Sequence, residues 1–359
     1  MENLKFIFVH GLSGWGSYDE QNERLPYWGL KSGDILKKLG EQGYAVFSAS
    51  VAPHGSAYDR ACELYAQLSG TIVDYGKTHS EMFGHARFGT DFRGRALIDA
   101  FDENTKLVLI GHSFGGATIR LFAHILEKGI KEECIGEHSA FFDGNRAGNI
   151  FSIMTVAAPH NGTTAYDLYE DPFFDTSAVK LTLKEKLAAK LMSRTNSADD
   201  RELPSEDCAA FDMHIDNARK LNEKLSVNEN IYYFSQPCSY TFQQKDGTYY
   251  PEKDMSVTFR KTSKLMGIYE GKSKEGCSLG KEWRENDGLV NTISSTYPFN
   301  QPYVLFDKDH VEKGKWNVFE TKHYDHMAMI GGLIHACDVF PYYLECVEMI
   351  SELYRNERK

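Results

Sequence analysis

The feature that most constrains the fold of this chain is the pentapeptide Gly-His-Ser-Phe-Gly at residues 111–115. An apolar run over residues 106–110 precedes it, and a stretch with helical spacing follows from residue 116. A serine between a buried strand and a helix is typical of a nucleophile elbow, a sharp turn that exposes the hydroxyl and needs small neighbours. The pattern therefore predicts a strand–turn–helix unit with Ser113 as a nucleophile. Without its flanks, the pentapeptide would fit a glycine-rich turn with an incidental serine equally well.

Apolar, strand-like runs alternate with helical stretches along most of the chain. This alternation predicts an α/β fold, with a mostly parallel central sheet and helices on both faces. We expect strands at residues 5–9, 44–48, 106–110, 150–156, 231–235 and 303–306, and helices at residues 33–40, 58–69, 115–127, 212–224 and 340–354. Longer segments at residues 51–95, 162–225 and 238–285 interrupt the alternation. We expect a single domain over residues 1–359, in which these segments are insertions.

The net charge limits which partners the protein can bind, and the cysteine positions limit which cross-links it can form. The 359 residues include 40 Lys and Arg against 51 Asp and Glu, so the net charge is −11. An acidic chain is a poor partner for nucleic acid or an anionic membrane surface. No apolar run reaches the roughly 18 residues of a membrane span. The seven cysteines are scattered without a C-x-x-C pair, so we expect neither a disulfide framework nor a thiolate metal site.

The first ten residues read as a strand rather than as a targeting segment. They lack the basic start, the long apolar stretch and the small-residue cleavage site of a signal peptide. The sequence as written therefore suggests a cytoplasmic protein, or a secreted one whose leader has been removed.

A serine hydroxyl is a poor nucleophile until a base takes its proton and a carboxylate orients that base. In folds with this elbow, the three residues follow in the order Ser, Asp, His. His326 is a candidate base, because it lies where a polar loop passes into an apolar helix start, and His323 is its rival. Asp287, at a turn before an apolar pair, is the candidate carboxylate. An aspartate in an ordinary surface turn would have the same sequence neighbours. Sequence spacing alone therefore does not decide whether Asp287 is the carboxylate of the triad.

The negative charge that develops during acyl transfer needs two backbone N–H donors. One donor should be Phe114, directly after the nucleophile. The other should come from the loop after the first strand. Because that strand ends just before Leu12, the N–H of Leu12 is the candidate.

Beyond these motifs, the sequence resembles the zinc-containing thermoalkalophilic bacterial lipases, a group that includes the staphylococcal lipases. The resemblance rests on HGLSGWG (10–16), DRACELYAQLSGTIVDYG (59–76), GHARFG (84–89), GHSFGG (111–116), APHNGTT (158–164), ENDGLVNT (285–292) and HYDH (323–326). It implies an α/β-hydrolase fold and the hydrolysis of acylglycerols or other carboxylic esters. It also places Ser113, Asp287 and His326 on catalytic positions, and Leu12 and Phe114 on oxyanion positions.

The same resemblance implies a structural zinc ion, held by Asp59, His79, His85 and Asp212. Two imidazoles and two carboxylates can complete a closed tetrahedral shell with no position for a substrate. The ion would therefore be structural and would connect the 51–95 insertion to the segment near residue 212. At the family's usual calcium positions this chain has Ala328 and, near residue 333, a leucine. Apolar side chains cannot ligate a cation that wants oxygen donors, so we expect no calcium there.

The segment that would form a lid is shorter here than in the family, over residues 165–211. Within it, Val179, Leu183, Leu187 and Leu191 are four residues apart and predict one apolar face on a helix over residues 177–192. We consider this helix a lid candidate, with an ordinary packed surface helix as the alternative.

The sequence thus favours a serine carboxylester hydrolase that acts on an ester or lipid substrate, also at an oil–water interface. An amidase, a thioesterase or a polyester hydrolase would use the same three residues. A catalytically silent binding protein with the α/β-hydrolase fold is the alternative from another class.

Overall fold

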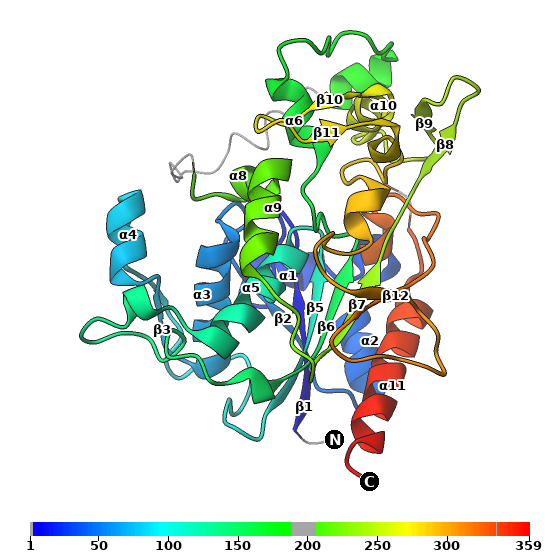
Figure 1. Ribbon diagram of the computed structural model, residues 1–359. Coiled ribbons are helices and arrows are strands. Elements are labelled where there is room, and N and C mark those ends of the chain that lie inside the picture. Colours follow the sequence, from blue (N-terminus) through cyan, green and yellow to red (C-terminus); the bar gives the residue numbers. More distant parts are fainter. Residues whose placement is uncertain (1–2, 189–205, 335) are drawn as a thin grey trace.

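The computed structural model describes residues 3–188, 206–334 and 336–359, and it is built around a seven-stranded parallel sheet (Figure 1). The strand order is β12-β13-β7-β6-β5-β1-β2, and every neighbouring pair is parallel. The strands are β1 (Leu4–Val9), β2 (Val46–Ala49), β5 (Lys106–His112), β6 (Ile150–Val156), β7 (Tyr232–Gln236), β12 (Tyr303–Leu305) and β13 (Trp316–Val318). The parallel α/β fold that the alternation predicts is confirmed.

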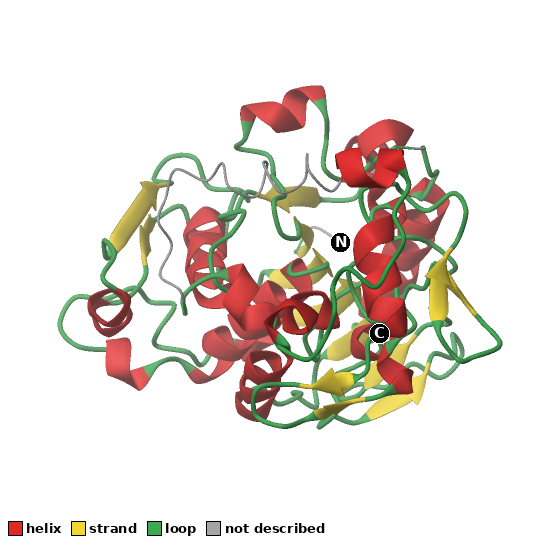
Figure 2. Ribbon diagram, turned by 90° about the horizontal axis from the view of Figure 1, so that it is seen from above, coloured by secondary structure: helices red, strands yellow, loops and turns green. Residues whose placement is uncertain are grey.

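Each face of the sheet is covered by its own helices. One face packs against α3 (Ala57–Ser69) and α5 (Gly115–Lys128), and the other against α2 (Ile35–Glu41) and α11 (Phe340–Asn356). The two pairs lie on opposite sides of the strands in Figure 1, and Figure 2 shows the same layering from above. Because successive side chains of a strand point to opposite faces, β1 sends Ile7 and Val9 into the first core and Phe6 and Phe8 into the second.

A smaller layer, which we call the cap, lies above the carboxyl ends of the strands (Figure 1). The cap comprises α6 (Thr164–Glu170), residues 171–188, α10 (Arg260–Ile268) and two antiparallel hairpins. The hairpins are β8 (Thr241–Gln243) with β9 (Tyr249–Pro251), and β10 (Gly271–Lys272) with β11 (Ser278–Leu279). A separate hydrophobic cluster around Leu168, Leu265 and Trp283 stabilises this layer.

The remaining elements surround the sheet and connect its layers. They are the helices α1 (Glu20–Arg24), α4 (Lys77–Phe83), α8 (Ala209–Met213) and α9 (Ile215–Lys224), the hairpin β3 (Ile72–Asp74) with β4 (Phe88–Asp91), and the 3₁₀ turns η1 (Leu30–Ser32), η2 (Lys131–Glu133), η3 (Ala147–Asn149), η4 (Lys281–Trp283), η5 (Thr292–Ser295) and η6 (Ala328–Ile330). None of the described helices is long and apolar enough to span a membrane.

Three local expectations differ from the structure. Strand β13 has no counterpart among the predicted strands, because its three residues are too few for a periodic signal. The helix expected over 212–224 is two helices, α8 and α9, because His214 between them has an extended backbone. In the stretch 177–192, helix begins at residue 183, and residues 189–192 lie outside the described part of the chain.

Candidate active site

Ser113 lies at the turn from β5 into α5, in a backbone conformation that few side chains adopt. Its φ is 55°, in the left-handed region, which costs energy and is typical of a nucleophile elbow. The turn also needs glycine next to it, since a Cβ on Gly115 would lie 2.3 Å from the carbonyl oxygen of Val9. The elbow geometry expected from the sequence is therefore present.

Three side chains from distant parts of the chain form a continuous hydrogen-bonded row. His326 Nε2 is 2.8 Å from Ser113 Oγ, and His326 Nδ1 is 2.8 Å from Asp287 Oδ2. All three residues are buried, with Ser113 7%, Asp287 1% and His326 3% exposed. A buried carboxylate–imidazole–hydroxyl row can orient the ring and take up the hydroxyl proton.

The carboxylate of Asp287 is fixed by backbone donors on its other oxygen. Oδ1 accepts hydrogen bonds from the N–H groups of Leu289, at 3.0 Å, and Val290, at 2.8 Å. The backbone N–H of His326 also donates to the carbonyl of Asp287 at 2.9 Å. The two loops are thus joined directly, and the second carboxylate oxygen is left for the imidazole.

A second buried histidine, His112, positions the loop that carries His326. His112 Nε2 donates to the carbonyl of His326 at 2.9 Å, and its Nδ1 is 2.7 Å from the hydroxyl of Tyr27. That hydroxyl accepts a hydrogen bond from the N–H of Gly11 at 2.9 Å. Burial, followed by the proximity of His326, lowers the pKa of His112 well below its usual value, so the ring is neutral. No sequence pattern indicated Tyr27 or His112 as positioning residues, although His112 lies within the elbow motif.

His323, the rival base, and Asp325, the acid next to His326 in sequence, have other partners. The side chain of His323 is 61% exposed, and its Nε2 lies 3.4 Å from Glu252 Oε1. Asp325 accepts hydrogen bonds from the N–H groups of Ser256, at 2.9 Å, and Ala328, at 3.0 Å. Neither residue shares a hydrogen bond with Ser113 or with the imidazole of His326.

The two N–H groups expected to bind an oxyanion are unpaired. Within residues 3–188, 206–334 and 336–359, neither Leu12 nor Phe114 has an acceptor on its backbone N–H. Phe114 is buried and Leu12 is partly buried, and two free N–H groups are the donors that an oxyanion at a serine would need. Arg60 contacts both loops, because its guanidinium donates to the carbonyl of His10, two residues before Leu12, and lies 5.0 Å from the Phe114 ring centroid.

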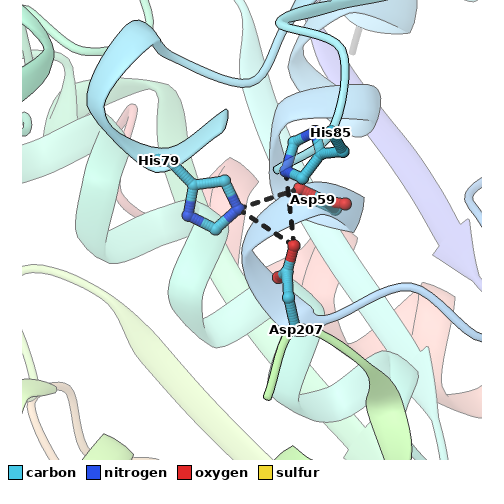
Figure 3. A group of neighbouring side chains, drawn as sticks. All are labelled: Asp59, His79, His85 and Asp207. Atoms are coloured by element: carbon cyan, nitrogen blue, oxygen red, sulfur yellow. Dashed lines mark ion pairs between the residues drawn. The ribbon is translucent and has the colours of Figure 1, made fainter. Parts of the chain in front are cut away.

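A second cluster lies on the α3 side of the sheet, where Asp59, His79, His85 and Asp207 point toward one another (Figure 3). His79 Nε2 is 3.2 Å from Asp59 Oδ1 and 3.3 Å from Asp207 Oδ2, and His85 Nε2 is 3.4 Å from Asp207 Oδ2. All four of these atoms are buried without a hydrogen-bond partner among the described residues. Burial by itself lowers the pKa of His79, but the carboxylates of Asp207 and Asp59 raise it to about 9. The donor set therefore fits a divalent cation such as zinc.

The structure corrects one residue of the expected zinc set: the fourth member is Asp207, not Asp212. Asp212 Oδ2 instead accepts the N–H of Ala57 at 2.7 Å, at the start of the helix that carries Asp59. Burial raises the pKa of Asp212 to about 7, which disfavours it as a carboxylate donor. The two aspartates are close in sequence, and spacing alone cannot decide which of them faces the histidines.

Comparison with known proteins places this geometry in a family. The family described as "Lipase-like, C-terminal domain" matches residues 2–180 and 174–340. The chain belongs to this family. The resemblance to staphylococcal lipases is thereby confirmed: the lipase of Staphylococcus epidermidis is 35% identical over 92% of this chain, and lipase 1 of Staphylococcus aureus is 34% identical over 90%. The chain spans about half the length of these two relatives, 50% of each.

Two solved structures extend this family likeness to the fold. The Staphylococcus hyicus lipase superposes with a TM-score of 0.82 at 28% identity, covering 99% of this chain and 97% of that one. EstA from Clostridium botulinum also has a TM-score of 0.82, at 30% identity, covering 97% of this chain and 87% of that one. The chain therefore shares its overall α/β fold with both structures.

Proposed function

We propose that this chain is a serine carboxylester hydrolase of lipase or esterase type, with Ser113 as its nucleophile. The observation that carries the proposal is the buried row of hydrogen bonds from Ser113 through His326 to Asp287. The names of the staphylococcal relatives, which are lipases, support the same reaction class.

In the proposed reaction, Ser113 Oγ attacks the ester carbonyl carbon while His326 Nε2 takes the hydroxyl proton. Asp287 holds the ring in the required tautomer and stabilises the imidazolium that forms. The N–H groups of Leu12 and Phe114 bind the oxyanion of the tetrahedral intermediate. The imidazolium then protonates the departing alcohol. Water, deprotonated by His326, cleaves the acyl-enzyme, releases the acid and regenerates Ser113.

The test is Ser113→Ala, assayed with a p-nitrophenyl ester. The change removes the nucleophile and should lower kcat by roughly 10⁶-fold without changing the melting temperature. Ser278→Ala, at an exposed position of the hairpin strand β11, is the matched control and should keep wild-type turnover. Undiminished turnover by Ser113→Ala would refute the proposal, and failure of the wild type to react with a fluorophosphonate would favour a silent binding protein.

For the substrate, we propose an acylglycerol or another carboxylic ester presented at a lipid surface. The cap carries strongly exposed apolar side chains, with Phe173 96%, Leu183 85% and Leu187 70% exposed, and such patches mark contact with apolar surfaces. Among the described residues of the predicted apolar face, Val179 is buried while Leu183 and Leu187 are exposed, so residues 177–188 remain the lid candidate. A panel of esters, amides, thioesters and polyesters distinguishes the alternative leaving groups.

We also propose that Asp59, His79, His85 and Asp207 hold a structural zinc ion. When bound, zinc would neutralise the two carboxylates and complete a closed shell that leaves no position for substrate. In this organisation the chain is a single domain with insertions, in which the metal would join the insertion at residues 51–95 to the segment around Asp207. The reaction at Ser113 uses no group of this cluster.

A further inference from the structure

A second group of metal-ligating side chains lies in the loop that follows α5. Cys134, His138 and Asp143 each offer one ligand atom, and these atoms lie within 4.8 Å of one another. His138 Nε2 is 2.9 Å from Asp143 Oδ1. A thiol, an imidazole and a carboxylate together form a donor set that suits zinc. The sequence has no C-x-x-C signal here, because the folded loop, rather than close spacing, brings the three side chains together.

The imidazole of His138 is already oriented as in a metal site. Its Nδ1 lies 2.8 Å from the carbonyl oxygen of Gly136, while Nε2 faces the carboxylate of Asp143. Metal-ligating histidines usually donate their other ring N–H to an oxygen in this way. In the first cluster, His85 has the same arrangement, with Nδ1 2.9 Å from the carbonyl of Ala86 and Nε2 facing Asp207. Because both nitrogens of His138 face acceptors, a cation at Nε2, either a proton or a metal ion, is required.

The loop holds its three donors in place through its own backbone. The N–H of Ile130 donates to the carbonyl of Phe142 at 2.8 Å and closes the neck of the loop. Cys134 Sγ lies 3.4 Å from both of these residues' carbonyl oxygens, so the sulfur sits at that neck. Asp74 accepts the N–H of Ser139 at 3.1 Å and fixes the far side of the loop. Little reorganisation is therefore needed to bind an ion.

The surroundings are negatively charged and open to solvent. Burial, followed by the nearby carboxylates of Asp143, Glu133 and Glu132, raises the pKa of the Cys134 thiol. The side chain of His138 is 22% exposed and that of Asp143 is 57% exposed, and Cys134 is also exposed. An aqueous ion can therefore reach the three donors and keep a water molecule as its fourth ligand.

We propose that Cys134, His138 and Asp143 form a second zinc site, separate from the Asp59–His79–His85–Asp207 cluster. On binding, the thiol proton and any proton on His138 Nε2 pass to solvent, and the ion bonds to Sγ, Nε2 and a carboxylate oxygen. This site is independent of the proposed hydrolysis.

The second site is connected to the first cluster through Glu133. The carboxylate of Glu133 accepts the N–H of Thr78 at 2.9 Å and the N–H of His79 at 2.8 Å. It therefore holds the start of α4, the helix that carries His79. An ion bound to Cys134 would therefore lie next to the residue that holds the start of α4.

Cobalt(II) substitution tests the proposal, because a thiolate bound to cobalt gives a charge-transfer absorption that oxygen and nitrogen donors do not. The first cluster contains no sulfur, so the absorption reports on a cysteine site alone. We expect the metal-free protein to develop this band when cobalt is added, and Cys134→Ser to lose it. Cys277→Ser, which removes a cysteine from the β10–β11 hairpin loop, is the matched control and should keep the band.

Two further variants and one chemical measurement establish the ligand set. His138→Asn and Asp143→Asn should each weaken cobalt binding at least tenfold, and zinc should slow the alkylation of Cys134 by iodoacetamide to a similar extent. Absence of the band, or a band unchanged in Cys134→Ser, overturns the proposal. A band lost in Cys134→Ser but unaffected by both other variants would show a lone thiolate binding cobalt, and would also overturn the three-residue site.

Discussion

At the residue scale, the position of His326 depends on side chains that take no part in the proposed proton transfer. The hydroxyl of Tyr27 both accepts from Gly11 and donates to His112, which in turn donates to the carbonyl of His326. One phenol thus links the loop after β1 to the loop of the proposed base, although the three segments are far apart in sequence.

Tyr27→Phe should therefore destabilise the protein and slow the reaction. The change leaves the buried N–H of Gly11 and the buried Nδ1 of His112 without partners, which costs about 1–3 kcal/mol for each unsatisfied group. Urea denaturation measures the stability, and kcat with a p-nitrophenyl ester measures the effect on the base. Tyr250→Phe, at a ring that is 39% exposed, should change neither quantity. Equal effects of the two variants would contradict the role assigned to Tyr27.

Comparing Asp287 with Asp325, the acid next to His326 in sequence, tests which carboxylate orients the imidazole. Asp287→Asn should lower kcat by about 10⁴-fold, because an amide favours the wrong tautomer of His326 and cannot stabilise the imidazolium. Asp325→Asn should have a much smaller effect on kcat, since that carboxylate accepts from the backbone of Ser256 and Ala328 instead. The measurement is kcat for both variants at equal melting temperature. A comparable loss in Asp325→Asn would count against Asp287 as the orienting carboxylate.

At the element scale, the cap segment at residues 177–188 is attached to α10 by one buried carboxylate. Glu185 is 3% exposed and lies 2.8 Å from Arg260 Nε and 2.9 Å from Lys264 Nζ, both on α10. Thr182 and Glu185 also exchange hydrogen bonds in a capping box, with Thr182 N to Glu185 Oε2 at 2.7 Å and Glu185 N to Thr182 Oγ1 at 3.3 Å. The helix therefore begins at residue 183 rather than at 177.

This attachment should weaken at low pH. Burial opposes ionisation of Glu185, but hydrogen bonds from Lys264, Thr182 and Arg260 outweigh it and lower the pKa from 4.5 to about 2. Because the folded pKa is the lower one, the stabilisation is complete above pH 4.5 and is lost as the pH falls toward about 2. Hydrogen exchange in residues 177–188, corrected for its intrinsic pH dependence, measures the loosening.

The matched variants for this prediction are Glu185→Gln and Glu170→Gln. Glu185→Gln should exchange faster at neutral pH and show little further change on acidification, since it lacks the titrating group. Glu170→Gln removes an exposed pair with Lys274 and should behave as the wild type. An unaltered pH dependence in Glu185→Gln would mean that another group attaches the segment.

At the scale of the whole molecule, the Asp59–His79–His85–Asp207 cluster joins four separate segments of the chain. It unites α3, α4, the loop before β4 and the residues that precede α8. Four buried polar atoms without partners would destabilise the metal-free protein, so the ion should contribute to the stability of the entire domain.

Chelation should accordingly lower the melting temperature by on the order of 10 °C, with ester turnover retained below the new melting temperature. The experiment uses a Cys134→Ser background, so that only this cluster is titrated, and calorimetry measures the transition. Asp207→Asn should reproduce the loss and abolish its reversal by zinc, whereas Asp212→Asn should still respond to zinc. Loss of turnover at temperatures where the chelated protein is folded would contradict a purely structural ion.

Local sequence determined the elements whose signal is carried by neighbouring residues. Apolar runs and periodicity predict the strands β1, β5 and β6 and the helices α3 and α5. The strained turn at Ser113 follows from the steric need for small residues around a sharp turn. The family resemblance added Asp287 and His326, which spacing left open against His323 and a surface aspartate.

Tertiary structure decided the contacts that join separate segments. It brought Asp207 rather than Asp212 to the two histidines, set Tyr27 against His112, and gathered Cys134, His138 and Asp143 into one loop. Periodicity reports which face of an element a residue occupies, but not which distant residue it will meet. Contacts between distant residues depend on how the loops pack against the folded sheet. Only this packing defines the direction of a side chain and its distance to a partner.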